Sequence, residues 1–98
     1  MVAANWLTVR YEGESFTYDD ACRLAARLAA SGCRPVAIRF EGTTRTSTAA
    51  LARLIVLRRR LLRMGQDLRI AGLRGQADGV YQIGRMSQIL PRIALPCR

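Results

Sequence analysis

Residues 42–65 read Gly-Thr-Thr-Arg-Thr-Ser-Thr-Ala-Ala-Leu-Ala-Arg-Leu-Ile-Val-Leu-Arg-Arg-Arg-Leu-Leu-Arg-Met-Gly. A loop of small hydroxylated residues runs directly into the pattern of a long helix, and short apolar segments at 36–40 and 68–71 flank this stretch. The order predicts strand, loop, helix and strand, joined as the right-handed crossover of an α/β domain. The loop then lies at the carboxyl end of the first strand, the favoured place for a site in an open α/β sheet.

The apolar residues of this stretch recur at helical spacing and predict a helix over 47–64. The expected inward stripe consists of Ala50, Leu54, Leu57, Leu61 and Met64, widened by Leu51, Ile55 and Leu62. The opposite side carries arginines that we expect to face water: Arg53, Arg59, Arg60 and Arg63. Arg58 lies at the edge of the apolar face, and we expect its stem to follow the core while its guanidinium reaches water.

The ends of this helix also have suitable residues. Ser47 is a good N-cap, with Thr46 or Thr48 as alternates, because a side-chain oxygen there accepts a hydrogen bond from the first free backbone amides. Gly65 is a good residue just after the helix, since glycine adopts the left-handed conformation that ends many helices. The core prediction places Leu54, Leu57 and Leu61 against apolar strand residues at Val36, Ile38 and Ile70.

The rest of the chain completes a small domain over 1–98, with loose termini at 1–5 and 91–98. Strands are expected near 6–11, 14–17, 35–40 and 67–71, and further helices near 19–31 and 77–86. The turn at 12–13 lets 14–17 return beside 6–11, so we expect a mixed sheet of four to five strands with helices mainly on one face. Thr17 and Asp20 form an acidic variant of the capping box. In the last helix, the residues expected to face inward are Val80, Ile83 and Met86.

The composition is strongly basic, with 16 Lys plus Arg, 7 Asp plus Glu and a net charge of +9. Every basic residue is arginine. Such a charge suits nucleic acid, an acidic protein or an anionic membrane surface. No stretch is rich in both arginine and aromatic residues, so we interpret the charge mainly as a solvated helix face and expect no specific nucleic-acid binding. A small basic nucleic-acid-binding protein remains an alternative.

Several classes of site are not expected. Histidine is absent, and Cys22, Cys33 and Cys97 form no CxxC pair, so neither a metal site nor a disulfide framework is indicated. The lack of histidine also removes the commonest general base, and we expect no enzyme activity and no cofactor. No apolar run is long enough to span a membrane and no signal peptide is evident, so a cytoplasmic location is expected.

From Pro35 to Leu90 the chain resembles the STAS domain, the fold of bacterial anti-sigma factor antagonists. That family reads strand, Asp-Ser-Ser-Gly-Leu, a helix ending in basic residues and a Gly, then a short strand. Counting back from Gly65 and Leu51 puts Ser47 at the Asp position and Thr48 at that of the phosphorylatable Ser. The Asp and the Gly of the motif are replaced here, so the hydroxyl of Thr48 is what this sequence keeps.

The resemblance implies a non-enzymatic regulatory protein that binds a protein partner through the 42–48 loop and the start of the following helix. The partner would be an anti-sigma factor or serine kinase, and phosphorylation would fall on Thr48 or Ser47. The expected partner-binding residues are Thr44, Arg45, Thr46, Ser47, Thr48, Ala49 and Ala50. Thr48 followed by Ala49 and Ala50 also resembles STAS subunits of phospholipid-transport ATP-binding cassette complexes, where the partner is the ATPase subunit. The sequence allows a homodimer.

Overall fold

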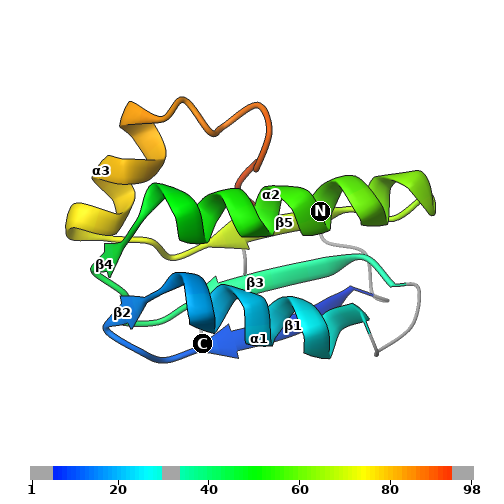
Figure 1. Ribbon diagram of the computed structural model, residues 1–98, viewed down its shortest axis with the longest axis horizontal. Coiled ribbons are helices and arrows are strands. Elements are labelled where there is room, and N and C mark those ends of the chain that lie inside the picture. Colours follow the sequence, from blue (N-terminus) through cyan, green and yellow to red (C-terminus); the bar gives the residue numbers. More distant parts are fainter. Residues whose placement is uncertain (1–5, 30–33, 94–98) are drawn as a thin grey trace.

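A computed structural model describes residues 6–29 and 34–93 (Figure 1). The elements follow in the order β1 (Leu7–Tyr11), β2 (Ser15–Phe16), α1 (Tyr18–Ala29), β3 (Val36–Phe40), β4 (Arg45–Thr46), α2 (Thr48–Arg63), β5 (Leu68–Ala71) and α3 (Gly75–Ile83). Most of the expected strands and helices are confirmed within the one to two residues by which boundary definitions differ. There are three exceptions: α1 is described only to residue 29, α3 was expected at 77–86 and ends three residues earlier, and β4 was expected to be loop. Within the described chain, no helix combines the length and the apolar character needed to cross a bilayer.

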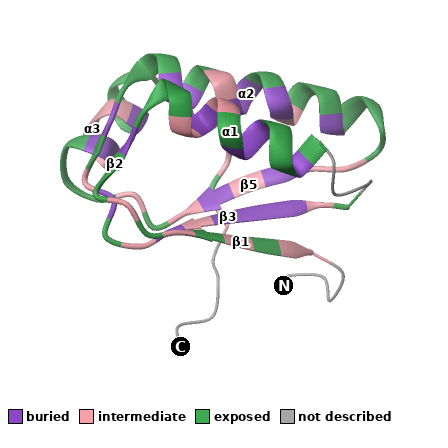
Figure 2. Cartoon of the chain, turned by 60° about the horizontal axis from the view of Figure 1, so that its bottom comes forward, coloured by how far each residue is buried: buried purple, intermediate pink, exposed green. Residues whose placement is uncertain are grey.

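The main sheet is parallel and has the strand order β1-β3-β5. Val36 in the central strand lies opposite Leu7 on one side and Leu68 on the other. Residues 91–93 extend the sheet beside β5, where Ile70 forms a parallel bridge with Arg92. The strands of the main sheet therefore lie side by side in the order in which they occur in the chain. The helices α1 and α2 lie on the same face of this sheet (Figure 2).

The prediction of a mixed sheet is wrong. β2 does not return along β1 but pairs in parallel with β4 in a separate two-stranded sheet, with Phe16 opposite Thr46. The reason lies in Phe16, which is fully buried and meets Tyr11 and Phe40 edge-on, with ring centroids 4.9 Å and 5.0 Å away. The ring reaches this aromatic cluster because the chain turns over the helix side of the sheet after β1.

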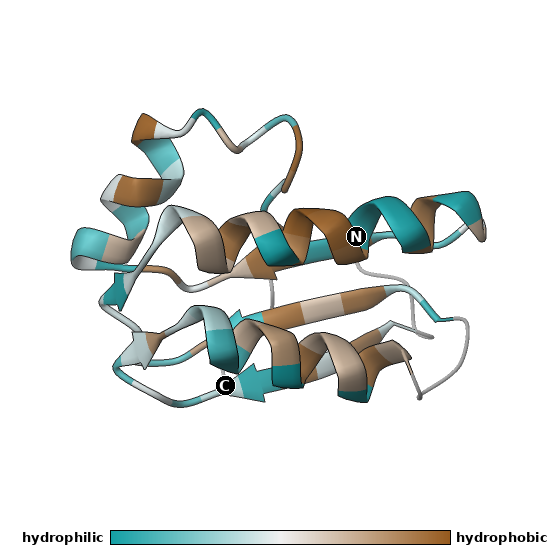
Figure 3. Ribbon diagram, in the orientation of Figure 1, coloured by the Kyte–Doolittle hydropathy of each residue, from teal (hydrophilic) through white to brown (hydrophobic). Residues whose placement is uncertain are grey.

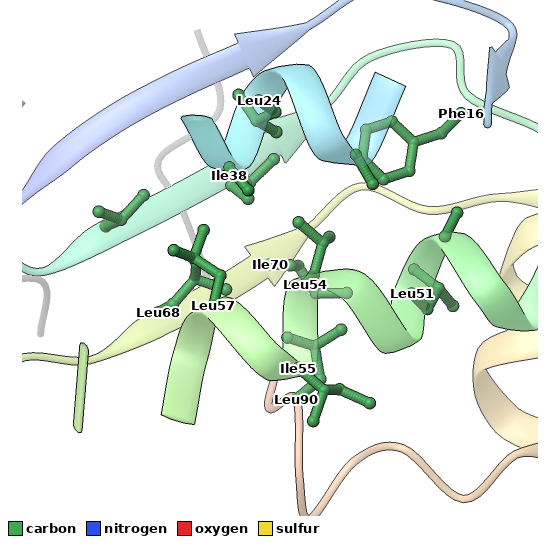
Figure 4. Close-up of a cluster of buried hydrophobic side chains, with 14 of the residues drawn as sticks. Phe16, Leu24, Ile38, Leu51, Leu54, Ile55, Leu57, Leu68, Ile70 and Leu90 are labelled. Atoms are coloured by element: carbon green, nitrogen blue, oxygen red, sulfur yellow. The ribbon is translucent and has the colours of Figure 1, made fainter. Parts of the chain in front are cut away.

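The core fills the space between the sheet and the two long helices (Figure 4). The predicted contacts are confirmed: the buried side chains include Leu54, Leu57, Leu61, Val36, Ile38 and Ile70. None of the described helices covers the other face of the sheet (Figure 2). The strand register assigns Arg10, Arg39 and Arg69 to this face, because they alternate with the buried residues of the same strands. This separation gives one apolar and one polar face, as expected for a two-layer domain.

Three side chains predicted to face inward are exposed: Leu62 by 46%, Met64 by 52% and Ile83 by 86%. In α2, Ile55 lies near Leu90 and is buried (Figure 4). Leu62, two turns later, is left exposed by the described chain. In α3 the buried positions are Ala77 and Tyr81, which places Ile83 on the outer side. Of the other two inward predictions in this region, Met86 is buried and Val80 is half-buried.

The helix ends follow the predicted chemistry. The Thr17 amide donates to Asp20 Oδ2 at 3.0 Å, and the Asp20 amide donates to Thr17 Oγ1 at 3.1 Å, which confirms the capping box. Gly65 has a φ of 78°, and the amides of Gly65 and Gln66 donate to the carbonyls of Leu62 and Leu61. These two bonds are those of a Schellman motif, so the predicted end of α2 is also confirmed.

Arg58 does not send its guanidinium into water. Its Nε donates to Asp67 Oδ1 at 2.9 Å, and only 16% of its side chain is exposed. Asp67 also accepts from Arg69 Nε and from the Leu68 amide. Burial acts to raise the Asp67 pKa, but these donors together outweigh it and hold the pKa below its ordinary value.

Candidate functional site

The 42–48 loop leaves the carboxyl end of β3 and passes through β4 into α2 (Figure 1). It lies between two other segments, the turn leading into β2 on one side and the start of α3 on the other. On the β2 side, the backbone amides of Thr44 and Arg45 both donate to the Glu14 carbonyl, at 2.9 Å and 3.1 Å. The loop is therefore joined to a segment about 30 residues away in the sequence.

Two threonines fasten the loop from inside. Thr43 is fully buried and donates from Oγ1 to the Gly13 carbonyl at 2.6 Å. Thr46 is 9% exposed and donates from Oγ1 to the Phe16 carbonyl at 2.7 Å. The expectation that the Thr46 hydroxyl is free to cap α2 is wrong, because a buried hydroxyl needs a partner and this one bonds across to β2.

The start of α3 fastens the loop from the opposite side. Gln76 Oε1 accepts a hydrogen bond from the Thr46 amide at 3.0 Å. This bond satisfies the edge of β4 that does not pair with β2. The Ala77 amide donates to the Thr44 carbonyl at 2.8 Å, and the Arg74 amide donates to the Thr43 carbonyl at 3.2 Å. This docking of α3 could not be predicted from the sequence, because nothing in the local pattern shows which backbone groups a distant glutamine reaches.

At the end of the loop, Ser47 caps α2 as predicted. Its backbone is extended, with φ −128° and ψ 160°, and its Oγ accepts the Ala50 amide at 3.1 Å. Thr48 is the first helical residue and is exposed, as is Ala49. The hydroxyl-bearing start of α2 therefore faces solvent on a loop whose backbone is held from both sides.

The structure narrows the surface that a partner could reach. Ala50 is fully buried and faces the core, and Thr46 is buried with its hydroxyl bonded, so these two predicted partner-binding residues lie inside the domain. Thr44 is half-buried. The predicted residues with exposed side chains are Arg45, Ser47, Thr48 and Ala49.

A shallow cavity of about 250 Å³ adjoins this surface. It lies between the starts of α1 and α2 and is lined by Ser15, Phe16, Thr17, Tyr18, Arg45, Thr46 and Ser47. Tyr18 at its edge is 50% exposed. This cavity could not be predicted from the sequence, because the cavity forms only where β2 and β4 pair.

The charges around the site differ between the two helices. α1 begins with Asp19 and Asp20, and the pKa of Asp20 is lowered to about 2, first by the Thr17 amide and further by the Thr17 and Tyr11 hydroxyls and Arg23. α2 carries no acidic residue. Arg59, Arg60 and Arg63 are exposed at its hydrophilic C-terminal end (Figure 3), and no ion pair forms on them within residues 6–29 and 34–93.

Among the described residues, no group of three or more His, Cys, Asp or Glu side chains is placed to hold a metal ion. Cys22 is half-buried, and its hydrogen bond with Tyr18 raises the pKa of that phenol. Cys33 and Cys97 lie outside the described residues.

Comparison of the chain with models of protein families, with curated proteins and with solved structures gave no match.

Proposed function

We propose that this chain is a non-enzymatic, STAS-like regulatory protein that binds a protein partner through the 42–48 loop and the start of α2, as anti-sigma factor antagonists do. The observation that carries the proposal is the exposure of Thr48 and Ala49 at the N-terminus of a long helix, on a loop fixed by Thr43, Thr46 and Gln76. A fixed loop with small exposed side chains loses little conformational entropy on binding, which favours association.

Phosphorylation would act at the same place. A phosphate on Thr48 would lie beside the free amides and the positive dipole end of α2, with Arg45 three residues earlier as a source of positive charge. The first turn of α2 contains no acidic residue that would repel it. In a partner interface the same charge would cost desolvation, so one modification would leave the fold intact and block docking.

The alternative is a STAS subunit of a phospholipid-transport ATP-binding cassette complex. It is supported by the Thr-Ala-Ala-Leu sequence at 48–51 and by the absence of acids from α2. In that case the contact is a permanent one with the ATPase subunit, and the exposed arginines of α2 meet an acidic surface. The two proposals differ in whether Thr48 carries phosphate in the cell, which the intact mass of the protein purified from its host measures.

A basic nucleic-acid-binding protein is a weaker candidate, because the arginines on the open sheet face are paired. Arg10 contacts Glu41 at 2.8 Å and Glu12 at 3.2 Å, Arg39 contacts Glu41 at 3.2 Å, and Arg69 contacts Asp67. Binding by the remaining arginines would be charge neutralisation alone, insensitive to sequence and lost steeply with salt. Tight, sequence-selective binding at physiological salt would favour this class instead.

The test of the main proposal is a pull-down from the native host with three baits: wild type, Thr48→Glu and Thr8→Glu. Thr8 is an exposed threonine of β1 that the strand register assigns to the side of the sheet away from the helices, so it is a matched control for the same change. We expect Thr48→Glu to lose the partner, while Thr8→Glu retains it. An acidic residue in the first turn of α2 favours the helix by about 0.3–1 kcal/mol, so the fold should persist, as circular dichroism will show.

The same partner on all three folded baits would mean that Thr48 lies outside the interface. Loss of the partner from both variants would mean that the interface lies elsewhere, or that added negative charge weakens binding wherever it is placed. Either result would remove the main support for the proposal.

A further inference from the structure

The two long helices lie side by side and end at the same end of the domain. Each of them runs back across the parallel sheet before the next strand begins, so α1 and α2 both finish beside the amino ends of the strands (Figure 1). The closing residues of the two helices and the segment that enters β3 carry exposed arginines, which we call the basic end: Arg27, Arg34, Arg59, Arg60 and Arg63.

The acidic residues do not balance the basic end. The chain has 7 Asp plus Glu residues, and of these only Asp67 lies at this end, where it already accepts from Arg58 and Arg69. The others follow β1 or β3, begin α1 or belong to α3: Glu12, Glu14, Asp19, Asp20, Glu41 and Asp78. Within the ranges that the structure describes, no ion pair forms on any arginine of the basic end.

Distance keeps the two kinds of charge apart. α2 has 16 residues and is therefore about 24 Å long. Charges in physiological salt are screened over about 8 Å. The carboxylates near the starts of the helices therefore leave the positive potential of the basic end intact, and that potential attracts an anionic partner.

Apolar side chains are exposed among these arginines. Leu62, in the last turn of α2, is 46% exposed, and Met64, directly after the helix, is 52% exposed. Val56 is 48% exposed and lies one turn before Arg60 on the same side of α2. The helix dipole favours arginines in a last turn, but neither the dipole nor solvation calls for apolar side chains beside them. The combination indicates a partner surface that is both anionic and partly apolar.

We infer that the basic end binds the surface of an anionic lipid bilayer. The guanidinium groups bind lipid phosphates, to which their planar fork offers parallel N–H donors. Leu62 and Met64 enter the boundary between the headgroups and the acyl chains, as the apolar residues of interfacial helices do. The contact is made at the surface, and no helix has to cross the bilayer.

A bilayer suits these residues better than other polyanions do. A nucleic acid would pair with the arginines but would leave Leu62 and Met64 in water. An acidic protein would need carboxylates placed opposite arginines that come from three separate segments, whereas lipid headgroups move laterally and meet any such arrangement. The inference does not depend on the proposed function, because the 42–48 loop lies beyond the carboxyl ends of the strands and stays accessible on a membrane (Figure 1).

The test is sedimentation of the full-length chain with vesicles of phosphatidylcholine, either alone or with roughly one third phosphatidylglycerol. We expect the anionic vesicles to bind at least about tenfold more tightly, and this binding to fall as salt is raised, because most of the attraction is between charges. Equal binding to the two kinds of vesicle, or no binding to the anionic one, would overturn the inference.

Two double variants with the same loss of charge locate the contact. Arg60→Gln with Arg63→Gln changes the basic end, whereas Arg74→Gln with Arg85→Gln changes exposed arginines elsewhere that also form no ion pair in the described chain. The first pair should weaken binding to anionic vesicles about tenfold or more, since each basic residue at such a surface contributes about fivefold. The second pair should weaken it less than about threefold. Equal weakening would reduce the binding to general charge attraction and refute the site.

A further pair of variants tests the apolar part of the contact. Leu62→Gln should weaken binding to anionic vesicles about threefold or more, because this side chain no longer enters the bilayer. Ile83→Gln is the control, since Ile83 is 86% exposed in α3, away from the basic end, and should bind like wild type. Circular dichroism checks that both variants are folded.

Polyglutamate, a soluble polyanion without an apolar interior, separates a bilayer from an acidic protein. Leu62→Gln should bind polyglutamate like wild type while it binds anionic vesicles more weakly. A wild-type chain that prefers polyglutamate to anionic vesicles at equal negative charge, with no effect of Leu62→Gln on either, would favour an acidic protein and overturn the bilayer as the partner.

Discussion

The 42–48 loop and the amino end of the main sheet are both held by polar contacts, but of different kinds. The loop is held by neutral groups: the hydroxyls of Thr43 and Thr46 donate to backbone carbonyls, and Gln76 accepts a backbone amide. At the amino end of β5, one carboxylate, that of Asp67, accepts from Arg58 and Arg69.

The difference shows how a site can change its charge without changing its shape. Neutral hydrogen bonds do not depend on protonation near neutral pH and are barely screened by salt, so the loop keeps its backbone when a phosphate is added or removed nearby. The ion pairs of Asp67 depend on its ionisation and are weakened by salt where they are exposed. Four predictions test this contrast.

The largest effect should be the same in both regions, because the apolar core extends to both ends of α2. Leu51 lies in the first turn of α2, near the loop, and is 0% exposed. Leu61 lies in the last turn of α2, near the amino end of the main sheet, and is 3% exposed. Replacing either with alanine should cost about 2–5 kcal/mol in the free energy of unfolding, measured with urea. A cost below about 1 kcal/mol for one of them would show that the core does not support that end.

Asp67→Asn should cost about 2 kcal/mol at neutral pH, because it removes charge-assisted bonds from Arg58 and Arg69. The folded-state pKa of Asp67 is lowered below the ordinary 3.8, so its contribution is complete above that value and is lost as the pH falls through the lower folded pKa. The difference in stability between wild type and Asp67→Asn should therefore shrink in acid. A difference that is constant from neutral to strongly acidic pH would contradict the ion pairs.

Thr46→Val should cost about 1 kcal/mol, because it removes a buried hydrogen bond and leaves the Phe16 carbonyl without this donor. Unlike the effect of Asp67→Asn, this cost should stay constant with salt and from pH 7 to pH 4. Thr44→Val is the control, since the Thr44 hydroxyl forms no hydrogen bond within the described chain and is only half-buried. Equal costs for the two threonines would mean that the bond to Phe16 does not fasten the loop.

The smallest effect should come from Arg60→Ala, because Arg60 lies on the exposed side of α2. It should change the free energy of unfolding by about 0.5 kcal/mol or less, as surface substitutions do. Arg58→Ala is its counterpart on the same helix and should cost more, because Arg58 is bonded to Asp67. Equal unfolding midpoints for the two variants would mean that the bond from Arg58 to Asp67 does not stabilise the fold.

Local sequence patterns were sufficient for most elements and for the helix ends. The spacing of Leu54, Leu57 and Leu61 placed the buried side of α2, and the chemistry of Ser47 and Gly65 placed its ends. These features depend on residues within a few positions of one another. For the same reason, the position of Thr48 at the exposed start of α2 could be predicted.

The errors arose where a distant segment decides the outcome. Arg58 was expected to reach water, but Asp67 lies within its reach once β5 is in place. Leu62 continues the apolar pattern, yet the described chain does not cover it. The pairing of β2 with β4, and with it the burial of Thr46, depends on where Phe16 meets its aromatic partners. Periodicity alone holds no information about these contacts.

The sequential order of the strands has a consequence for how the chain is made. β1 pairs with β3, β3 pairs with β5, and residues 91–93 come last beside β5, so no later segment inserts between two earlier ones. During synthesis each pair can close as soon as its second strand emerges, and no completed pair has to open again. The loop that precedes α2 is then enclosed in two steps: its β2 side closes once residues 45–46 have emerged, and its α3 side only after residues 74–77 have been made.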